Sequence, residues 1–146
     1  MKSIFIALFS IYSLVSCGTT NNLQVTSKAN RVVSQASDLA VKEVSIEHLT
    51  SSFLESGSDS QHNHIVVEIT GLVVAYGLTE GGVYTVTLRQ DNKDALCTFD
   101  PSVSNQFGGG RKVSSGAELT LRGQCQSSGL FASHPFTVHG CKIVRN

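Results

Sequence analysis

The chain has little of what nucleic-acid binding usually requires. It contains no tryptophan, only three tyrosines and seven phenylalanines, and its eleven Lys and Arg residues are balanced by eleven Asp and Glu residues. Affinity for phosphate comes mainly from an excess of Lys and Arg, and sequence-tolerant base binding from aromatic stacking. The composition therefore argues against nucleic acid as a partner.

Motifs of catalysis and metal binding are also missing. The sequence has no Cys-x-x-Cys, no Gly-x-Ser-x-Gly and no His-Glu-x-x-His. The glycines at 108–110 precede Arg111 and Lys112, but Val113 follows where a phosphate-binding loop needs Ser or Thr, which favours a flexible loop. We predict no catalytic residues, no metal site and no cofactor, and hence a protein that is not an enzyme.

The longest apolar run is too short to span a membrane. It extends from Ile4 to Val15, about 12 residues, whereas a membrane-spanning helix needs roughly 20. Lys2 precedes the run, and Leu14-Val15-Ser16-Cys17 ends it in the pattern of a bacterial lipoprotein signal. We predict that residues 1–17 are a signal segment ending at Cys17, whose thiol receives a diacylglyceryl group. A plain secretory signal is the alternative.

This signal predicts where the protein is found. Two or three acyl chains anchor a protein stably, so membrane lipid is the first expected partner, through Cys17. No acidic residue follows Cys17 before Asp38, so nothing directly downstream resembles an acidic sorting signal. We expect a membrane-anchored lipoprotein at the outer membrane, facing the periplasm.

Three cysteines remain after Cys17. Outside the cytoplasm, one disulfide among Cys97, Cys125 and Cys141, with one thiol left over, is one interpretation. Three pairings are possible and the sequence does not choose among them. Buried free thiols are the second interpretation, and the spacing disfavours zinc.

A tether and two helices are predicted between Cys17 and the first strand. Residues 18–27 are rich in Thr, Asn and Ser, which is typical of a flexible tether, and apolar spacing indicates a helix within residues 29–43. Ser45 suits the N-cap of a second helix, and Gly57 ends it. The apolar face of this second helix carries Ile46, Leu49, Phe53 and Leu54. We therefore divide the mature chain into residues 18–43 and a folded domain, residues 44–146.

From residue 64 onward the pattern changes to short strands. Alternating and β-branched segments predict strands at 64–74, 83–88, 95–99, 117–125 and 136–144. Asp91-Asn92 is the predicted centre of a turn, and Gly71 is expected to bend the first strand. A short helix is expected to begin at Asp100-Pro101. Five strands with a bent first strand and a helical or irregular segment after the third predict a mainly β fold, a Greek-key OB-fold barrel preceded by one or two short helices.

Several of these segments resemble the tRNA-anti-like OB-fold family of small bacterial lipoproteins. The resemblance covers about residues 44–144 and is carried by Val67-Glu68-Ile69-Thr70-Gly71-Leu72-Val73, Cys97-Thr98-Phe99, Leu119-Thr120-Leu121-Arg122-Gly123-Gln124-Cys125 and Cys141-Lys142-Ile143-Val144. It implies an OB-fold without an established enzymatic activity. The glycines at 108–110 depart from the fuller helix of the family at that point.

The usual binding face of an OB-fold suggests which residues to test for binding. That face lies on the second and third strands and on two neighbouring loops. Here it would carry Tyr76, Tyr84, Arg89 and Lys93, together with Leu130 and Phe131 in the last loop. His62 and His64 are interpreted as a solvated loop, and His134 and His139 as structural. We expect a non-catalytic module that binds an envelope protein, a peptide or a saccharide; single-stranded nucleic acid is the alternative.

Overall fold

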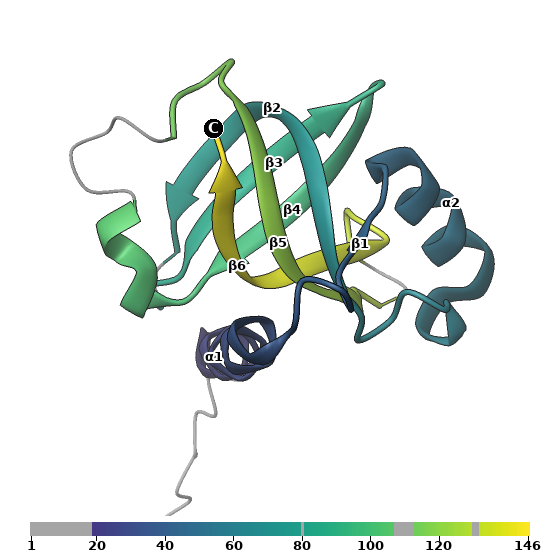
Figure 1. Cartoon of the computed structure of the whole chain (residues 1–146), viewed down its shortest axis with the longest axis horizontal. Coiled ribbons are helices and arrows are strands. Elements are labelled where there is room, and N and C mark those ends of the chain that lie inside the picture. Colours follow the sequence, from purple (N-terminus) through teal and green to yellow (C-terminus); the bar gives the residue numbers. More distant parts are fainter. Residues whose placement is uncertain (1–18, 80, 107–112, 130–131) are drawn as a thin grey trace, which may run out of the picture.

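The computed structural model describes residues 19–79, 81–106, 113–129 and 132–146 (Figure 1). Two α-helices precede the barrel, α1 (Thr19–Gln35) and α2 (Ile46–Ser56). Of the two 3₁₀ helices, η1 (Gly57–Asp59) follows α2 directly, and η2 (Pro101–Gln106) follows β4. The strands are β1 (Lys42–Glu43), β2 (Val66–Leu78), β3 (Tyr84–Gln90), β4 (Lys93–Phe99), β5 (Glu118–Ser127) and β6 (Phe136–Arg145). Among the described residues, no helix is both long and apolar enough to cross a membrane.

The strands β2 to β6 close into the predicted five-stranded barrel. Their order is β2-β3-β4-β6-β5, and β5 pairs back onto β2. All neighbours are antiparallel except β4 and β6, which run parallel and join the two halves of the barrel. The short β1 extends the sheet beside β2, also in parallel. The expected OB-fold is confirmed. Strand β1 was not predicted, because a strand of two residues is too short to show an alternating pattern.

Strand β2 belongs to both halves of the barrel, as the expected bend requires. Its residues from Val66 to Leu72 pair with β5, and those from Leu72 to Leu78 pair with β3. A Cβ on Gly71 would lie 2.9 Å from the backbone oxygen of Arg89, so only glycine lets β3 approach this closely. The register shift itself falls between Val73 and Ala75, just after the glycine.

Local signals account for the β3–β4 hairpin and for α2. Asp91 and Asn92 both have left-handed φ angles, 49° and 61°, as the predicted two-residue turn demands. The Ser45 side chain accepts a hydrogen bond from the backbone N–H of His48 at 3.1 Å, and Gly57 ends the helix with a φ of 52°.

Helix α2 covers one end of the barrel core. Ile46, Leu49 and Phe53 are buried, and the Phe53 ring stacks on Phe136 of β6 with centroids 5.2 Å apart. Leu54, which we assigned to the same apolar face, is 70% exposed. The predicted apolar face included one residue too many, because Leu54 lies on the side of α2 that turns away from the barrel.

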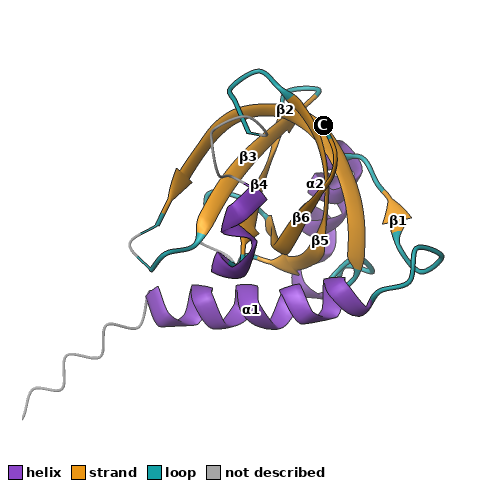
Figure 2. Ribbon diagram, turned by 60° about the vertical axis from the view of Figure 1, so that its left-hand side comes forward, coloured by secondary structure: helices purple, strands orange, loops and turns teal. Residues whose placement is uncertain are grey.

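Helix α1 corrects the expected tether. It begins at Thr19, and its buried residues Thr26, Ala29 and Val33 pack on the outside of the barrel (Figure 2). It ends at Gln35, whereas the sequence indicated a helix within 29–43. Asn, Ser, Thr and Val are modest helix formers, so the composition resembles that of a linker. Contacts with strands more than 70 residues away, rather than intrinsic propensity, hold this segment helical.

The predicted short helix after β4 is the 3₁₀ helix η2. Asp100 Oδ1 accepts a hydrogen bond from the backbone N–H of Ser102 at 2.9 Å and thereby caps it. Ser27 of α1 donates to the other carboxylate oxygen of Asp100, so this cap also joins α1 to the barrel. The glycines at 108–110 lie outside the described residues.

Candidate functional site

A groove of about 360 Å³ lies on the outside of the barrel at the parallel junction of β4 and β6. We call it the seam groove. It combines α1, β4, β6, the end of β5 and the β5–β6 loop. Its lining residues are Val25, Leu96, Gln126, Ser127, Ser128, Ala132, Ser133, His134, Thr137 and His139. None of these side chains is a lysine, an arginine or a carboxylate.

A chain of hydrogen bonds fixes the floor of the seam groove beneath α1. The Thr98 hydroxyl lies 3.0 Å from the hydroxyl of Thr26 and 2.8 Å from Nδ1 of His139, so it can donate to one and accept from the other. Burial lowers the pKa of His139 to about 4. The imidazole is therefore neutral at physiological pH, with one ring nitrogen able to accept a hydrogen bond.

The rim of the seam groove is held by polar contacts of the β5–β6 loop and of the strand ends beside it. The hydroxyls of Ser128 and Thr137 lie 2.7 Å apart, and the Ser128 N–H donates to the carbonyl of Pro135 at 3.2 Å. The side-chain amide of Gln126 donates to that of Gln124 at 3.1 Å. The groove thus offers hydroxyl, amide and imidazole groups on a backbone whose ends are anchored.

The structure describes four of the six residues that we assigned to the binding face, and these four lie on β2, β3 and β4. Tyr76 is 60% exposed at the far end of β2, while Tyr84 packs against the core. Arg89 donates two hydrogen bonds to Asp94, at 2.7 and 2.9 Å, which lowers the pKa of that carboxyl and occupies the guanidinium. Lys93 is exposed at the hairpin. Leu130 and Phe131 lie outside the described residues.

Sequence reasoning missed the seam groove because α1 forms one of its walls. The loop containing His134 and the strand containing His139 were recognised, but both histidines were interpreted as structural. His139 does have such a role through Thr98, yet it also lines the groove. No local signal shows that Val25, more than 70 residues before Leu96 in the chain, lies beside them.

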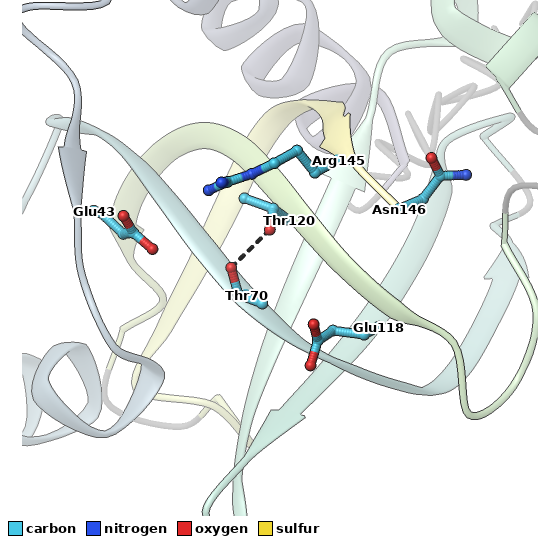
Figure 3. A pocket seen from close by; sticks show the side chains of 6 residues that line it. All are labelled: Glu43, Thr70, Glu118, Thr120, Arg145 and Asn146. Atoms are coloured by element: carbon cyan, nitrogen blue, oxygen red, sulfur yellow. Dashed lines mark hydrogen bonds between the residues drawn. The ribbon is translucent and has the colours of Figure 1, made fainter.

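A second groove, of about 330 Å³, lies across β2 and β5 (Figure 3). Thr70 and Thr120 form its floor, with their hydroxyls 2.7 Å apart, and Arg145 and Glu118 flank them in the close view. Glu43, Glu118, Arg145 and Asn146 are all exposed to solvent. Water weakens interactions of exposed charges, so this surface offers a ligand less than the seam groove does.

One of the two histidines before β2 corrects a prediction: His64 is exposed as expected, whereas His62 is not. His62 is buried rather than solvated, and its ring meets His48 of α2 edge to face, with centroids 5.3 Å apart. Burial is the main reason that the pKa of His62 is lowered, followed by the charge of His48. His64 has a φ of 65°, and its N–H donates to the carbonyl of Cys125 at 2.7 Å. Helix α2 packs against this loop and excludes water from the His62 ring, which the sequence alone does not show.

The cysteines Cys97, Cys125 and Cys141 are fully buried in the core and are free thiols in the structure. Of the two interpretations left open by the sequence, this arrangement corresponds to buried thiols. In the part of the chain that is described, no group of three His, Cys, Asp or Glu side chains is arranged to hold a metal ion.

A closed five-stranded barrel with a parallel β4–β6 junction defines an OB-fold domain. The chain belongs to the tRNA_anti-like family, whose model matches residues 1–133. The resemblance inferred from the strand motifs is therefore confirmed. No match is found among curated proteins.

Solved structures of similar fold come from several contexts. A candidate nucleic acid-binding lipoprotein of Klebsiella pneumoniae aligns with a TM-score of 0.59 at 19% identity, covering 76% of this chain and all of that one. A candidate aspartyl-tRNA synthetase from Leishmania major gives 0.52 at 8% identity, over 73% of this chain and 24% of the synthetase. The structure of yeast Stn1 and Ten1 aligns with a TM-score of 0.51 at 16% identity, covering 84% of this chain and 70% of the matched chain. At these identities the likeness shows the fold alone.

Proposed function

We propose that this protein is a bacterial lipoprotein, anchored through Cys17, that carries a non-catalytic OB-fold binding module at residues 44–146. The lipobox at residues 14–17 supports the anchor, as does the fold shared with a protein described as a lipoprotein. Helix α1 begins two residues after Cys17 and packs on the barrel. The module would therefore be held close to the membrane surface, with its groove facing the periplasm.

Metabolic labelling with a radioactive fatty acid tests the anchor. The wild-type chain should incorporate label and remain with the membranes, whereas Cys17→Ser should lose both properties. Cys125→Ser is the matched control, because its thiol is buried in the barrel and should not affect labelling. Equal labelling of the wild type and Cys17→Ser would contradict the anchor.

The seam groove favours an uncharged ligand that forms hydrogen bonds. The observation that carries this proposal is its lining of hydroxyls, amides and neutral imidazole, without a side chain of Lys, Arg, Asp or Glu. A phosphate backbone needs cations, which this groove does not supply. A saccharide, or the backbone of an extended peptide, matches such groups.

Single-stranded nucleic acid is the second candidate, favoured by the family match and by the fold shared with the Klebsiella protein, which is described as nucleic acid-binding. These findings do not support our expectation that nucleic acid is an unlikely partner, which rested on charge and composition. Lys93 is an exposed cation near the hairpin, but Arg89 is held by Asp94. The two candidates differ in their response to salt.

Amide chemical shifts, recorded with an N-acetylglucosamine oligomer, an uncharged peptide and a thymidine oligonucleotide, separate the candidates. We expect a neutral ligand to shift the amides of Leu96 and Thr137 with an affinity that salt does not change. Thr137→Arg should abolish these shifts, and Thr70→Arg, in the second groove, should retain them. Binding of the oligonucleotide alone, weakening steeply between 50 and 500 mM salt as expected from counterion release, would establish the alternative.

A further inference from the structure

The last turn of strand β2 exposes two large apolar side chains next to each other. Tyr76 and Leu78 are 60% and 61% exposed, and we call this pair the β2 tip. From Leu72 to Leu78 the sequence of the strand contains no charged residue. Exposed strand ends usually carry charges that keep other apolar surfaces away, and an apolar patch without them marks a contact surface.

A β-bulge decides to which side of the sheet the β2 tip points. The pairing of β2 with β3 shifts register in the segment after Val73. Beyond the shift, Tyr76 pairs with Val86 and Leu78 with Tyr84, two residues that pack in or against the core. Paired residues point to the same side of a sheet, and a shift of one residue reverses that side. The bulge thus turns the β2 tip to the core side, where it extends past the packed interior.

Helix α2 covers the opposite end of strand β3. The backbone N–H of Ile46, the first residue of α2, donates to the side-chain oxygen of Gln90 at 2.9 Å, beside the β3–β4 hairpin. The β2 tip pairs instead with the beginning of β3, at Tyr84 and Val86. The two ends of the barrel therefore differ, because one lies under α2 and the other exposes the β2 tip.

Helix α1 runs toward the end of the barrel that carries the β2 tip. The backbone of Asn30 lies against Gly140 of β6, and nearer the start of the helix Thr26 meets Thr98 of β4. Strand β3 and then β2 come next in the sheet. From Thr26 back to its start the helix extends about 10 Å, which is about two strand spacings. Figure 2 accordingly shows the N-terminal end of α1 and the end of β2 on the same side of the barrel.

The proposed lipid anchor is attached at this same end of the barrel. Cys17 precedes Thr19, the first residue of α1, by two residues, which span about 7 Å at most. Helix α1 also contains Lys28 and Arg31 and no acidic residue. Anionic phospholipids attract that charge. The position of the anchor and the charge of the helix both favour a bilayer beside the β2 tip.

From this arrangement we infer that Tyr76 and Leu78 dock on the phospholipid bilayer into which the acyl chains of Cys17 insert. This inference rests on the proposed anchor. A tyrosine places its ring at the membrane interface and its hydroxyl toward water, and the leucine adds apolar burial. A second copy of the chain is the competing occupant, but the anchor holds the bilayer beside the tip at a high effective concentration. Docking would fix the orientation of the barrel on the membrane.

Partitioning into vesicles tests the docking surface separately from lipidation in the cell. The chain from Cys17 onward contains every helix and strand of the structure. It receives one myristoyl chain on Cys17 by maleimide coupling, which the three buried thiols should not compete for. A single acyl chain binds a bilayer only marginally, so one further apolar contact changes the bound fraction measurably.

Leu78→Ser should reduce partitioning into phosphatidylcholine–phosphatidylglycerol vesicles about tenfold, because an exposed leucine gains much of its transfer free energy on docking. Leu39→Ser is the matched control, since Leu39 is fully exposed beyond the other end of α1 and should not touch the bilayer. Circular dichroism should report the same barrel for both variants, because neither side chain is buried.

Fluorescence quenching provides a second measurement on the same vesicles. The chain has no tryptophan, so Tyr76→Trp introduces a single fluorophore at the β2 tip. Brominated phospholipids should reduce its emission at least about twofold, because an aromatic ring at the interface touches the upper acyl chains. Leu39→Trp should keep its emission in the same vesicles.

Three outcomes separate docking from its alternatives. Either equal partitioning of the wild type and Leu78→Ser or unquenched emission of Tyr76→Trp would overturn the docking surface. A dimer in sedimentation velocity that Leu78→Ser abolishes and that vesicles do not dissociate would assign the tip to a second copy instead. Loss of Cys17 labelling in cells would reject the anchor alone, because the vesicle assay attaches its acyl chain chemically.

Discussion

Gly140 is the residue on which the docking of α1 depends. Its φ of 63° favours glycine, and a Cβ there would lie only 2.5 Å from the carbonyl carbon of Ala29 and would also overlap the backbone of Asn30. Helix α1 therefore crosses β6 in direct backbone contact. This close approach explains why a polar helix with few apolar residues packs at all.

Replacing Gly140 by alanine should detach α1. We expect Gly140→Ala to lower the free energy of unfolding by about 2–4 kcal/mol, the sum of a left-handed alanine and an overpacked contact. Gly129→Ala is the matched control, since its φ is 86° but open space surrounds it, and it should cost about 1 kcal/mol. Urea denaturation measures both, and equal losses would show that α1 does not rest on Gly140.

His139 makes stability depend on pH in a defined direction. Its pKa falls from 6.5 in the unfolded chain to about 4 in the barrel, so the unfolded chain binds the proton more readily. The resulting stability is fully present above pH 6.5 and is lost as the pH falls toward 4. Between pH 8 and pH 5 the loss should be about 2 kcal/mol.

Substituting His139 by glutamine isolates this contribution. His139→Gln should reduce the dependence of unfolding free energy on pH between 8 and 5, although its stability at pH 8 is lower because the bond to Thr98 is altered. His62, whose pKa is lowered as well, continues to titrate in both proteins and cancels in the comparison. Parallel pH profiles of the two proteins would refute the assignment.

At the scale of elements, Arg122 joins the α1–β1 connection to the barrel wall. It donates to Glu68 of β2 at 2.6 and 3.0 Å and to Asp38 at 2.8 Å. The side chains of Arg122 and Glu68 are only 11% and 14% exposed, whereas Asp38 is 88% exposed. The two ion pairs should therefore differ in energy although they share one guanidinium.

Removing the guanidinium should destabilise the fold far more than removing its exposed partner. Arg122→Met leaves the Glu68 carboxylate enclosed without a counter-charge, and we expect a loss of about 2–4 kcal/mol. Asp38→Asn should change stability little, because solvent screens that pair. Thermal denaturation compares the variants. Similar melting temperatures for both would mean that Glu68 finds enough water to remain charged.

At the scale of the whole molecule, we expect two units of unequal stability, the barrel with α2 on one hand and α1 on the other. The barrel and α2 share one core, from Ile46 to Cys141, whereas α1 buries few side chains against the outer surface. Because α1 has weak intrinsic helix propensity, it should unfold as soon as it leaves the barrel. The seam groove would then lose the wall containing Val25.

Native-state hydrogen exchange should resolve these two units. We expect amides in the middle of α1 to exchange with a smaller opening free energy than those of β2 and β5, because only α1 needs to detach. Gly140→Ala should accelerate α1 exchange further and leave the barrel amides nearly unchanged. Identical opening free energies for α1 and the barrel would show a single cooperative unit instead.

Predictions based on neighbours in the sequence succeeded for this protein. The start of α2 at Ser45 and its end at Gly57 were predictable, because the capping hydrogen bonds of these residues involve partners within four positions. Asp91 and Asn92 centre a hairpin because the left-handed turn is a local property. Leu54 and His62 were misplaced because their exposure depends on how α2 packs against distant parts of the chain.

The sequence by itself determined the strand pattern, the turns and the OB-fold class, since each rests on alternation or turn chemistry; the lipobox at Cys17 stays a prediction from a contiguous motif. Only the tertiary structure decided that residues 19–35 form a docked helix, that Val25 meets Leu96 and Thr137, and that Val138 separates Cys97 from Cys125. These features arise from contacts between segments that barrel closure brings together. Their energies depend on burial and close approach, which no local pattern of residues encodes.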